Sequence, residues 1–254
     1  MSDRRLFLKL LSSLPLSVVL ASPRISRAVA AALETVTETL PDGRAVTGVL
    51  AVPEGPATGG ILLVHEWWGL NDQIKAMAAE LAREGYVALA VDLYAGKVAA
   101  DPDRARALMQ AVDPGVATTT VGHWVRWLRA HENTAGKVAT IGWCFGGGWS
   151  LNASLAAPVD ATVVYYGNVD KTAAELAGLN GPVLGHFATE DNWIDRDMVG
   201  RFEAAMDTAG KGYTSHWYEA QHAFANPTSA RYDAGDAALA WRRTLDFLRA
   251  QLVG

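Results

Sequence analysis

The chain has 254 residues, of which 50% are hydrophobic and 19% are charged, and its formal net charge is -5 at pH 7. This composition predicts one globular domain with a sizeable core and excludes a disordered or fibrous chain. The negative charge weighs against nucleic acid as a partner, because a phosphate backbone is bound by clusters of Lys and Arg.

The first 32 residues are typical of an export signal. Arg4 and Arg5 precede an apolar stretch over 10–21, and small residues follow around Ala30. The run over 3–9 resembles the twin-arginine motif, which implies the twin-arginine export machinery as a partner and a periplasmic or secreted location. The alternative is a basic amphipathic helix or membrane anchor, but this stretch is too short for a stable membrane span and Pro15 interrupts it. We therefore expect a signal peptide over 1–32 and a single domain over 33–254.

The rest of the chain alternates between short apolar runs and helical patterns. A leading hairpin is expected over 35–53. Strands are expected over 60–65, 86–91, 137–143, 161–166, 182–188 and 215–218, and helices over 71–83, 101–111, 116–131, 146–157, 195–209 and 231–251. Apolar strands separated by helices predict an α/β fold, with a mainly parallel central sheet and helices on both faces.

The strongest local motif is the run Gly142-Trp143-Cys144-Phe145-Gly146, which fits the nucleophile elbow with cysteine in place of serine. It lies between an expected strand and an expected helix. The sharp turn requires small residues two positions either side of the nucleophile, and the N-terminus of the following helix favours a thiolate. Cys144 is the only cysteine in the chain, so an intrachain disulfide is excluded. A buried structural thiol is the alternative role.

A nucleophile of this type needs a base and an orienting acid, which in this arrangement follow it in the order acid, then histidine. Asp191 comes just after one expected strand and His222 just after the last. Glu190 and Asp195 compete for the role of the acid, and a solvated loop or a helix cap is their alternative role. The other candidate histidines lie on expected helices or inside strands: His123, His131, His186 and His216.

The oxyanion formed during acyl transfer needs backbone N–H donors, and we expect these at Phe145 and Trp67. No metal site is expected, because the run after His65 lacks the second histidine of a zinc motif and the chain has no CxxC pair. Gly96-Lys97 does not complete a phosphate-binding loop. We therefore expect no cofactor.

Several motifs in order resemble the dienelactone hydrolase family of the α/β-hydrolase superfamily. The resemblance covers roughly residue 34 to the end of the chain. The motifs are His65-Glu66-Trp67-Trp68-Gly69, Asp92-Leu93-Tyr94, Gly142-Trp143-Cys144-Phe145-Gly146-Gly147, Glu190-Asp191, His216-Trp217-Tyr218-Glu219 with His222 and Phe224, and the run over 243–248.

The resemblance implies an α/β-hydrolase fold, a Cys144-His222-Asp191 triad, and a role for Glu66 beside the thiol in controlling its ionisation. Capping of the next helix is the alternative role for Glu66.

The substrate pocket departs from the family pattern. The arginines that bind the substrate carboxylate in dienelactone-cleaving members correspond to Gly96 and Asn226 here, and a serine after the triad histidine is Ala223. Three polar contacts are therefore missing from these positions, which weighs against dienelactone itself. Lys97 or Arg231 could supply a replacement charge.

Five residues are the candidate substrate contacts: Trp68, Tyr94, Lys97, Phe224 and Asn226. The aromatic residues around the motifs suit either an aromatic pocket or an ordinary core.

The sequence thus predicts hydrolysis of a small-molecule lactone or activated ester through an acyl-enzyme on Cys144. A thiolate leaves more readily than an alkoxide, so good leaving groups such as those of enol lactones and aryl esters are favoured. One alternative is a periplasmic carboxylesterase or thioesterase that acts on neutral substrates. The other is a non-catalytic protein that uses Cys144 as a redox-sensing thiol.

Overall fold

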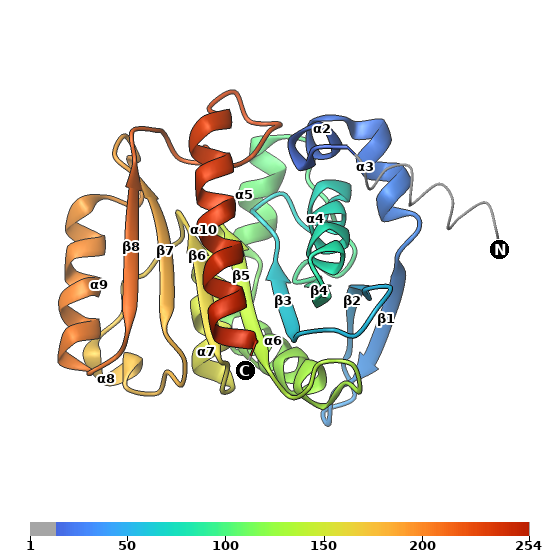
Figure 1. Cartoon of the computed structure of the whole chain (residues 1–254), viewed down its shortest axis with the longest axis horizontal. Coiled ribbons are helices and arrows are strands. Elements are labelled where there is room, and N and C mark those ends of the chain that lie inside the picture. The colour runs from blue at the N-terminus through green and yellow to red at the C-terminus, as the bar shows by residue number, and fades with distance from the viewer. Residues whose placement is uncertain (1–13, 254) are drawn as a thin grey trace.

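An eight-stranded sheet forms the centre of the computed structural model, which describes residues 14–253 (Figure 1). The strands are β1 (Glu34–Thr39), β2 (Ala45–Ala51), β3 (Gly60–Val64), β4 (Val87–Val91), β5 (Val138–Trp143), β6 (Ala161–Tyr165), β7 (Val183–Ala188) and β8 (Tyr213–Tyr218). Their order across the sheet is β1-β2-β4-β3-β5-β6-β7-β8. The antiparallel pairs are β1 with β2 and β2 with β4, and the other strands pair in parallel.

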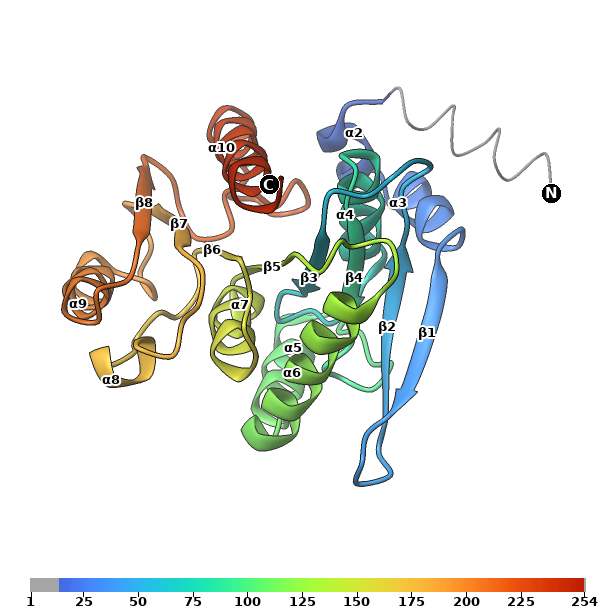
Figure 2. The same cartoon turned by 60° about the horizontal axis from the view of Figure 1, so that its bottom comes forward.

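Helices cover both faces of the sheet, as Figure 2 shows. They are α2 (Leu16–Ala21), α3 (Pro23–Ala30), α4 (Asp72–Arg83), α5 (Pro102–Gln110), α6 (Pro114–Ala130), α7 (Phe145–Ala156), α8 (Ala173–Leu176), α9 (Arg196–Thr208) and α10 (Ala234–Leu252). One core joins the sheet to α2, α3, α4 and α10, and two others join it to α6, α7, α8 and α9. The expected α/β fold is confirmed, and the strands β3 to β7 are buried throughout because helices cover both sides.

The last helix begins later than the sequence predicts. It was expected from residue 231, but α10 starts at Ala234 because the Asp233 carboxylate accepts a hydrogen bond from the Asp236 N–H and caps the helix. Residues 226–233 instead form a chain of turns beside the carboxyl ends of the strands. The short helix α8 was not predicted, although Thr172 and Glu175 form a capping box at its start.

The carboxyl ends of the parallel strands bring the candidate residues together. Glu66 follows β3, Cys144 follows β5, Asp191 follows β7 and His222 follows β8. The strand order reverses beside β3, where β4 lies on one side and β5 on the other. In open α/β sheets such a reversal leaves a crevice at the carboxyl edge, where ligands bind.

Residues 16–30 form two helices that pack against the domain. Leu20 is 3% exposed within the core beside α4, and the Ser26 hydroxyl donates to the Val19 carbonyl at 2.7 Å. Arg27 forms an exposed ion pair with Asp72 of α4. Arg4 and Arg5, on which the twin-arginine prediction rests, lie outside the described residues. No helix within 14–253 combines the length and apolar character needed to cross a bilayer.

The packing of α2 leads to a stability prediction for the full chain. Replacing Leu20 with Ala should lower the free energy of unfolding by about 2–5 kcal/mol, because it removes buried methyl groups and leaves a cavity against α4. Urea unfolding of the purified protein measures this change.

Val18 is the matched control, because it lies on the same helix and is 44% exposed. Val18→Ala should change the free energy of unfolding by no more than about 0.5 kcal/mol. Equal, small effects of the two substitutions would show that α2 does not dock on the domain in solution.

Candidate active site

Cys144 lies at a sharply turned position between β5 and α7. Its backbone has φ 55° and ψ -119°, a conformation that L-residues rarely adopt. A Cβ at Gly142 would collide with the backbone of Gly146, and a Cβ at Gly146 would collide with the backbone of Val64 and His65. The turn therefore requires glycine at both positions, as the motif predicts.

Two backbone donors beside Cys144 are free. Within the described residues, neither the Trp67 N–H nor the Phe145 N–H has a hydrogen-bond acceptor, although both residues line the same cleft as Cys144. Phe145 is also the first residue of α7, so its N–H belongs to the positive end of that helix. A developing oxyanion would find two donors here.

Asp191 and His222 form a buried hydrogen-bonded pair. The His222 Nδ1–H donates to Asp191 Oδ2 at 2.6 Å, while Asp191 Oδ1 accepts from the N–H groups of Trp193 and Ile194. Burial raises the pKa of Asp191, but the His222 hydrogen bond and charge and the two backbone donors outweigh it, so the pKa is lowered. An ionised Asp191 that accepts from Nδ1 fixes the tautomer and leaves Nε2 of the neutral ring as a base.

The imidazolium form of His222 is strongly stabilised. Burial alone would lower its pKa, but the hydrogen bond to Asp191 and then the hydrogen bond and charge of Cys144 raise it to about 10. The rings of Tyr166 and Trp193 lie 5.0 and 5.1 Å from the imidazole, centroid to centroid, and exclude water from it. The site therefore suits a thiolate beside an imidazolium, which is the reactive form of a cysteine nucleophile.

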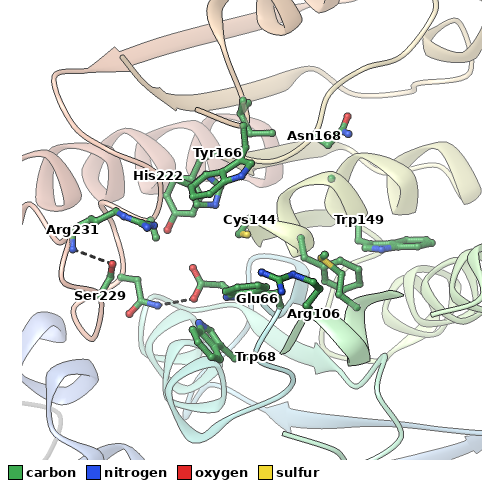
Figure 3. Close-up of a pocket in the computed structure, with 18 of the residues that line it drawn as sticks. Glu66, Trp68, Arg106, Cys144, Trp149, Tyr166, Asn168, His222, Ser229 and Arg231 are labelled. Atoms are coloured by element: carbon green, nitrogen blue, oxygen red, sulfur yellow. Dashed lines mark hydrogen bonds between the residues drawn. The ribbon is translucent and has the colours of Figure 1, made fainter. Parts of the chain in front are cut away.

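Glu66 is buried in the same cleft (Figure 3). Its Oε2 accepts from the Asn226 side-chain amide at 2.6 Å, whereas Oε1 has no partner among the described residues. Gln73 donates to the Asn226 oxygen at 2.8 Å, which fixes the orientation of that amide. Burial raises the pKa of Glu66 despite the opposing effects of Asn226, His222 and Tyr166. A partly satisfied carboxyl group therefore lies beside the thiol.

The cleft has a volume of about 1080 Å³ and a largely aromatic wall. The aromatic residues in the wall are Trp67, Trp68, Phe145, Trp149, Tyr166 and Trp193. Trp143, by contrast, is buried in the core against Tyr165. The sequence left an aromatic pocket and an ordinary core as equal alternatives, and the aromatic residues near the motifs divide between the two.

The predicted substrate contacts separate into two groups. Trp68 and Asn226 line the cleft. Tyr94 does not line the cleft. Its ring packs against the rings of Phe145 and His65, at centroid distances of 5.7 and 4.6 Å. Phe224 does not line the cleft either, because it is fully buried between Tyr166 and Tyr218. Lys97 is exposed and does not line the cleft.

The competitors for the acid have other environments. Glu190 is exposed, and Asp195 caps α9 by accepting from the Met198 N–H at 2.8 Å. His186 is buried and bonded to Tyr218 and Thr244, and it does not line the cleft.

Three cationic residues line the cleft wall. The sequence did not predict Arg106 or Lys171 as substrate contacts, and it offered Arg231 as a possible charge without giving its position. Arg106 comes from α5, Lys171 from the segment before α8, and Arg231 from the turns before α10. The Arg231 guanidinium lies 5.4 Å from the centre of the Trp193 ring. Figure 3 shows Arg231 on the His222 side of the cleft and Arg106 near Glu66 and Trp149. No local motif marks these positions, because tertiary packing alone brings them to the cleft.

Comparisons with known proteins show the family and the fold of this chain. The model of the Dienelactone hydrolase family matches residues 46–252. Carboxymethylenebutenolidases from Pseudomonas putida and Pseudomonas knackmussii are each 30% identical over 225 residues, which cover 82% of this chain and 92% of each relative. The solved structure of a dienelactone hydrolase-like promiscuous phosphotriesterase from metagenomic libraries has a TM-score of 0.78 at 23% identity, covering 87% of this chain and 99% of that one.

The raised pKa of His222 leads to a prediction for the pH dependence of activity. Ester hydrolysis that needs the imidazolium should fall as pH rises through about 10, the pKa of His222. Replacing Asp191 with Asn removes the hydrogen bond and charge that raise this pKa, so the alkaline limb should move to lower pH. In addition, kcat should fall by up to about 10⁴-fold. Profiles of kcat/KM against pH test this.

Asp195→Asn serves as the control, because Asp195 caps a helix outside the cleft. It should leave the alkaline limb where the wild-type protein has it. An alkaline limb that Asp191→Asn does not move would contradict the assignment of Asp191.

Proposed function

Since the chain belongs to the dienelactone hydrolase family, we propose that it hydrolyses a lactone or an activated carboxylic ester through an acyl-enzyme on Cys144. The observation that supports this proposal most strongly is that His222 and Cys144 lie in the same cleft. The imidazole is held by Asp191 at 2.6 Å, and the neighbouring thiol contributes to its raised pKa. A lone buried thiol would need neither an oriented imidazole nor two free backbone donors.

In the first step the Cys144 thiolate attacks the carbonyl carbon and forms a carbon–sulfur bond, and the carbonyl electrons move to the oxygen. The N–H groups of Trp67 and Phe145 stabilise this oxyanion. One such donor contributes on the order of 10²–10³ to kcat in acyl-transfer enzymes. When the tetrahedral intermediate collapses, the His222 imidazolium gives its proton to the departing oxygen.

In the second step neutral His222 accepts a proton at Nε2 from a water molecule that attacks the thioester. The carbon–sulfur bond then breaks, which releases the acid and restores the thiolate and the imidazolium. In a lactone the departing oxygen stays attached to the acyl group, so a single hydroxy acid or its keto tautomer leaves the cleft.

The leaving group limits the range of substrates. A thiolate is a better leaving group than an alkoxide, so an intermediate formed from an unactivated alkyl ester returns to substrate more often than it proceeds. Enol lactones and aryl esters have stabilised departing oxygens, and they fit this chemistry best.

Although Glu66 and Asp170 also line the cleft, its three cationic residues favour a substrate with a carboxylate. The positions 96 and 226 carry no cation, but Arg106, Lys171 and Arg231 line the wall from other elements. Arg231 has no carboxylate partner among the described residues, and Arg106 has only an exposed contact of 3.4 Å with Asp103. Guanidinium groups bind carboxylates through two parallel hydrogen bonds, so these arginines can take the place of the contacts missing from the motifs.

The neutral-ester alternative rests on Gly96, Ala223 and Asn226, and the cationic wall weighs against it. The redox-sensing alternative leaves the Asp191-His222 pair without a purpose.

We further propose that residues 1–32 direct the protein to the twin-arginine export machinery and hence to the periplasm or the exterior. The basis is the run over 3–9 and the apolar stretch that follows it.

The experiment that tests the function compares three substrates: cis-dienelactone, which carries a carboxylate, a neutral enol lactone and an aryl acetate. The wild-type protein should hydrolyse the first with the highest kcat/KM, and Cys144→Ala should hydrolyse none of them. Arg231→Gln and Arg106→Gln should each lower kcat/KM for the carboxylate substrate about tenfold or more, because a hydrogen bond to a charged group contributes about 1.5–3 kcal/mol.

The same two substitutions should leave kcat/KM for the neutral lactone nearly unchanged. Arg126→Gln, at an exposed position of α6 outside the cleft, is the matched control and should affect neither substrate. Equal effects on charged and neutral substrates would support the neutral-ester alternative, and hydrolysis that survives Cys144→Ala would contradict the mechanism.

A further inference from the structure

His65 is buried directly behind the two free backbone donors. It is fully shielded from solvent, and it follows β3 immediately. Its ring lies 5.8 Å from the ring of Phe145 in a stacked arrangement and 4.6 Å from the ring of Tyr94. The catalytic steps above give this histidine no role, although it touches one donor residue and is two positions from the other.

The hydrogen bonds of His65 fix its tautomer. The Leu93 N–H donates to Nε2 at 3.3 Å, so Nε2 is unprotonated. The proton is therefore on Nδ1, which donates to the Glu66 carbonyl at 2.6 Å. Burial lowers the pKa of His65 to about 4, so the ring is uncharged near neutral pH.

The bond to the Glu66 carbonyl also orients the next N–H. The Glu66 carbonyl and the Trp67 N–H belong to one planar trans peptide, in which the two groups point in opposite directions. The carbonyl accepts from His65 on the core side and also from the Gly69 N–H at 3.1 Å. The Trp67 N–H must then point away from the core, and it has no acceptor among the described residues.

We propose that His65 is a positioning residue for the oxyanion site, whose Nδ1–H holds the Glu66 carbonyl so that the Trp67 N–H faces the oxygen of the carbonyl group that Cys144 attacks. His65 also braces Phe145, the second donor, through the stacked ring. The bond from Leu93 ties the ring to the segment after β4, so one side chain connects both donors to the central sheet. This inference rests on the proposed acyl-transfer function.

Two substitutions of His65 separate its two hydrogen bonds. An Asn side chain places its amide where Nδ1 lies and can still donate to the Glu66 carbonyl, but it cannot reach Leu93. A Gln side chain places its amide near Nε2, where it can meet Leu93 but not the Glu66 carbonyl. Both side chains end in an amide, so the two variants bury similar polar groups and should have similar desolvation costs.

The proposal predicts that His65→Asn retains kcat for the aryl acetate within about fivefold, whereas His65→Gln loses about 10–100-fold with little change in KM. That loss is smaller than the 10²–10³ for deleting a donor, because Gly69 still holds the carbonyl. Alkylation of Cys144 by iodoacetamide forms no oxyanion. Its rate should therefore match the wild-type rate in both variants, and this also shows that the site is folded.

Two outcomes would overturn the proposal: kcat in His65→Gln equal to or above that in His65→Asn, or an alkylation rate that falls in parallel with kcat. If one variant does not fold, the other decides through its ratio of kcat to alkylation rate, relative to the wild-type ratio. This ratio should lie within about fivefold of one for His65→Asn and should be reduced at least tenfold for His65→Gln. A wild-type protein with no hydrolysis dependent on Cys144 would instead refute the proposed function, and the two failures are thereby distinguished.

Discussion

The turn at Cys144 constrains the rest of the site. A positive φ at a residue with a side chain costs on the order of 1–3 kcal/mol, and the surrounding backbone must hold it in place. Here the start of α7 lies so close to the end of β3 that Gly146 has no room for a Cβ. The same close approach sets the Phe145 N–H beside the segment that carries Trp67. The strained backbone at Cys144 and the free donors around it are therefore both linked to the close contact between α7 and β3.

Buried charge is the second feature that shapes the site. Asp191 remains ionised because three donors satisfy it, whereas Glu66 has one oxygen bonded and one without a partner among the described residues. Burial raises the pKa of both carboxyl groups. In Asp191 the hydrogen bonds and the charge of His222 outweigh burial, so the pKa is lowered, whereas in Glu66 burial dominates and the pKa is raised. The donors on both oxygens of Asp191 hold its carboxylate in place, and this carboxylate orients the His222 ring.

The sequence was sufficient where function depends on residues next to strand ends. Cys144, Asp191 and His222 each come after a strand, and parallel strands bring their carboxyl ends to one edge of the sheet. It was insufficient for the cleft wall. Arg106 lies on an amphipathic helix that carries no motif. Arg231 lies in the turns before α10, which begins only after its cap at Asp233, and these turns bring Arg231 to the cleft. Tyr94 and Phe224 belong to motifs, yet packing buries them behind the residues that line the cleft. The burial of Leu20 beside α4 could not be anticipated either, because an apolar run in an export signal has the same composition as a core helix.

In the mechanism that we propose, the acyl group of the substrate passes through the Cys144 sulfur. Acid quenching of the protein during the first turnovers of an aryl acetate, followed by intact-mass measurement and peptide mapping, tests this most directly. We expect one added acetyl group, confined to the peptide that contains Cys144 and absent from Cys144→Ala. An acetyl group on any other residue, or turnover by Cys144→Ala at the wild-type rate, would contradict it.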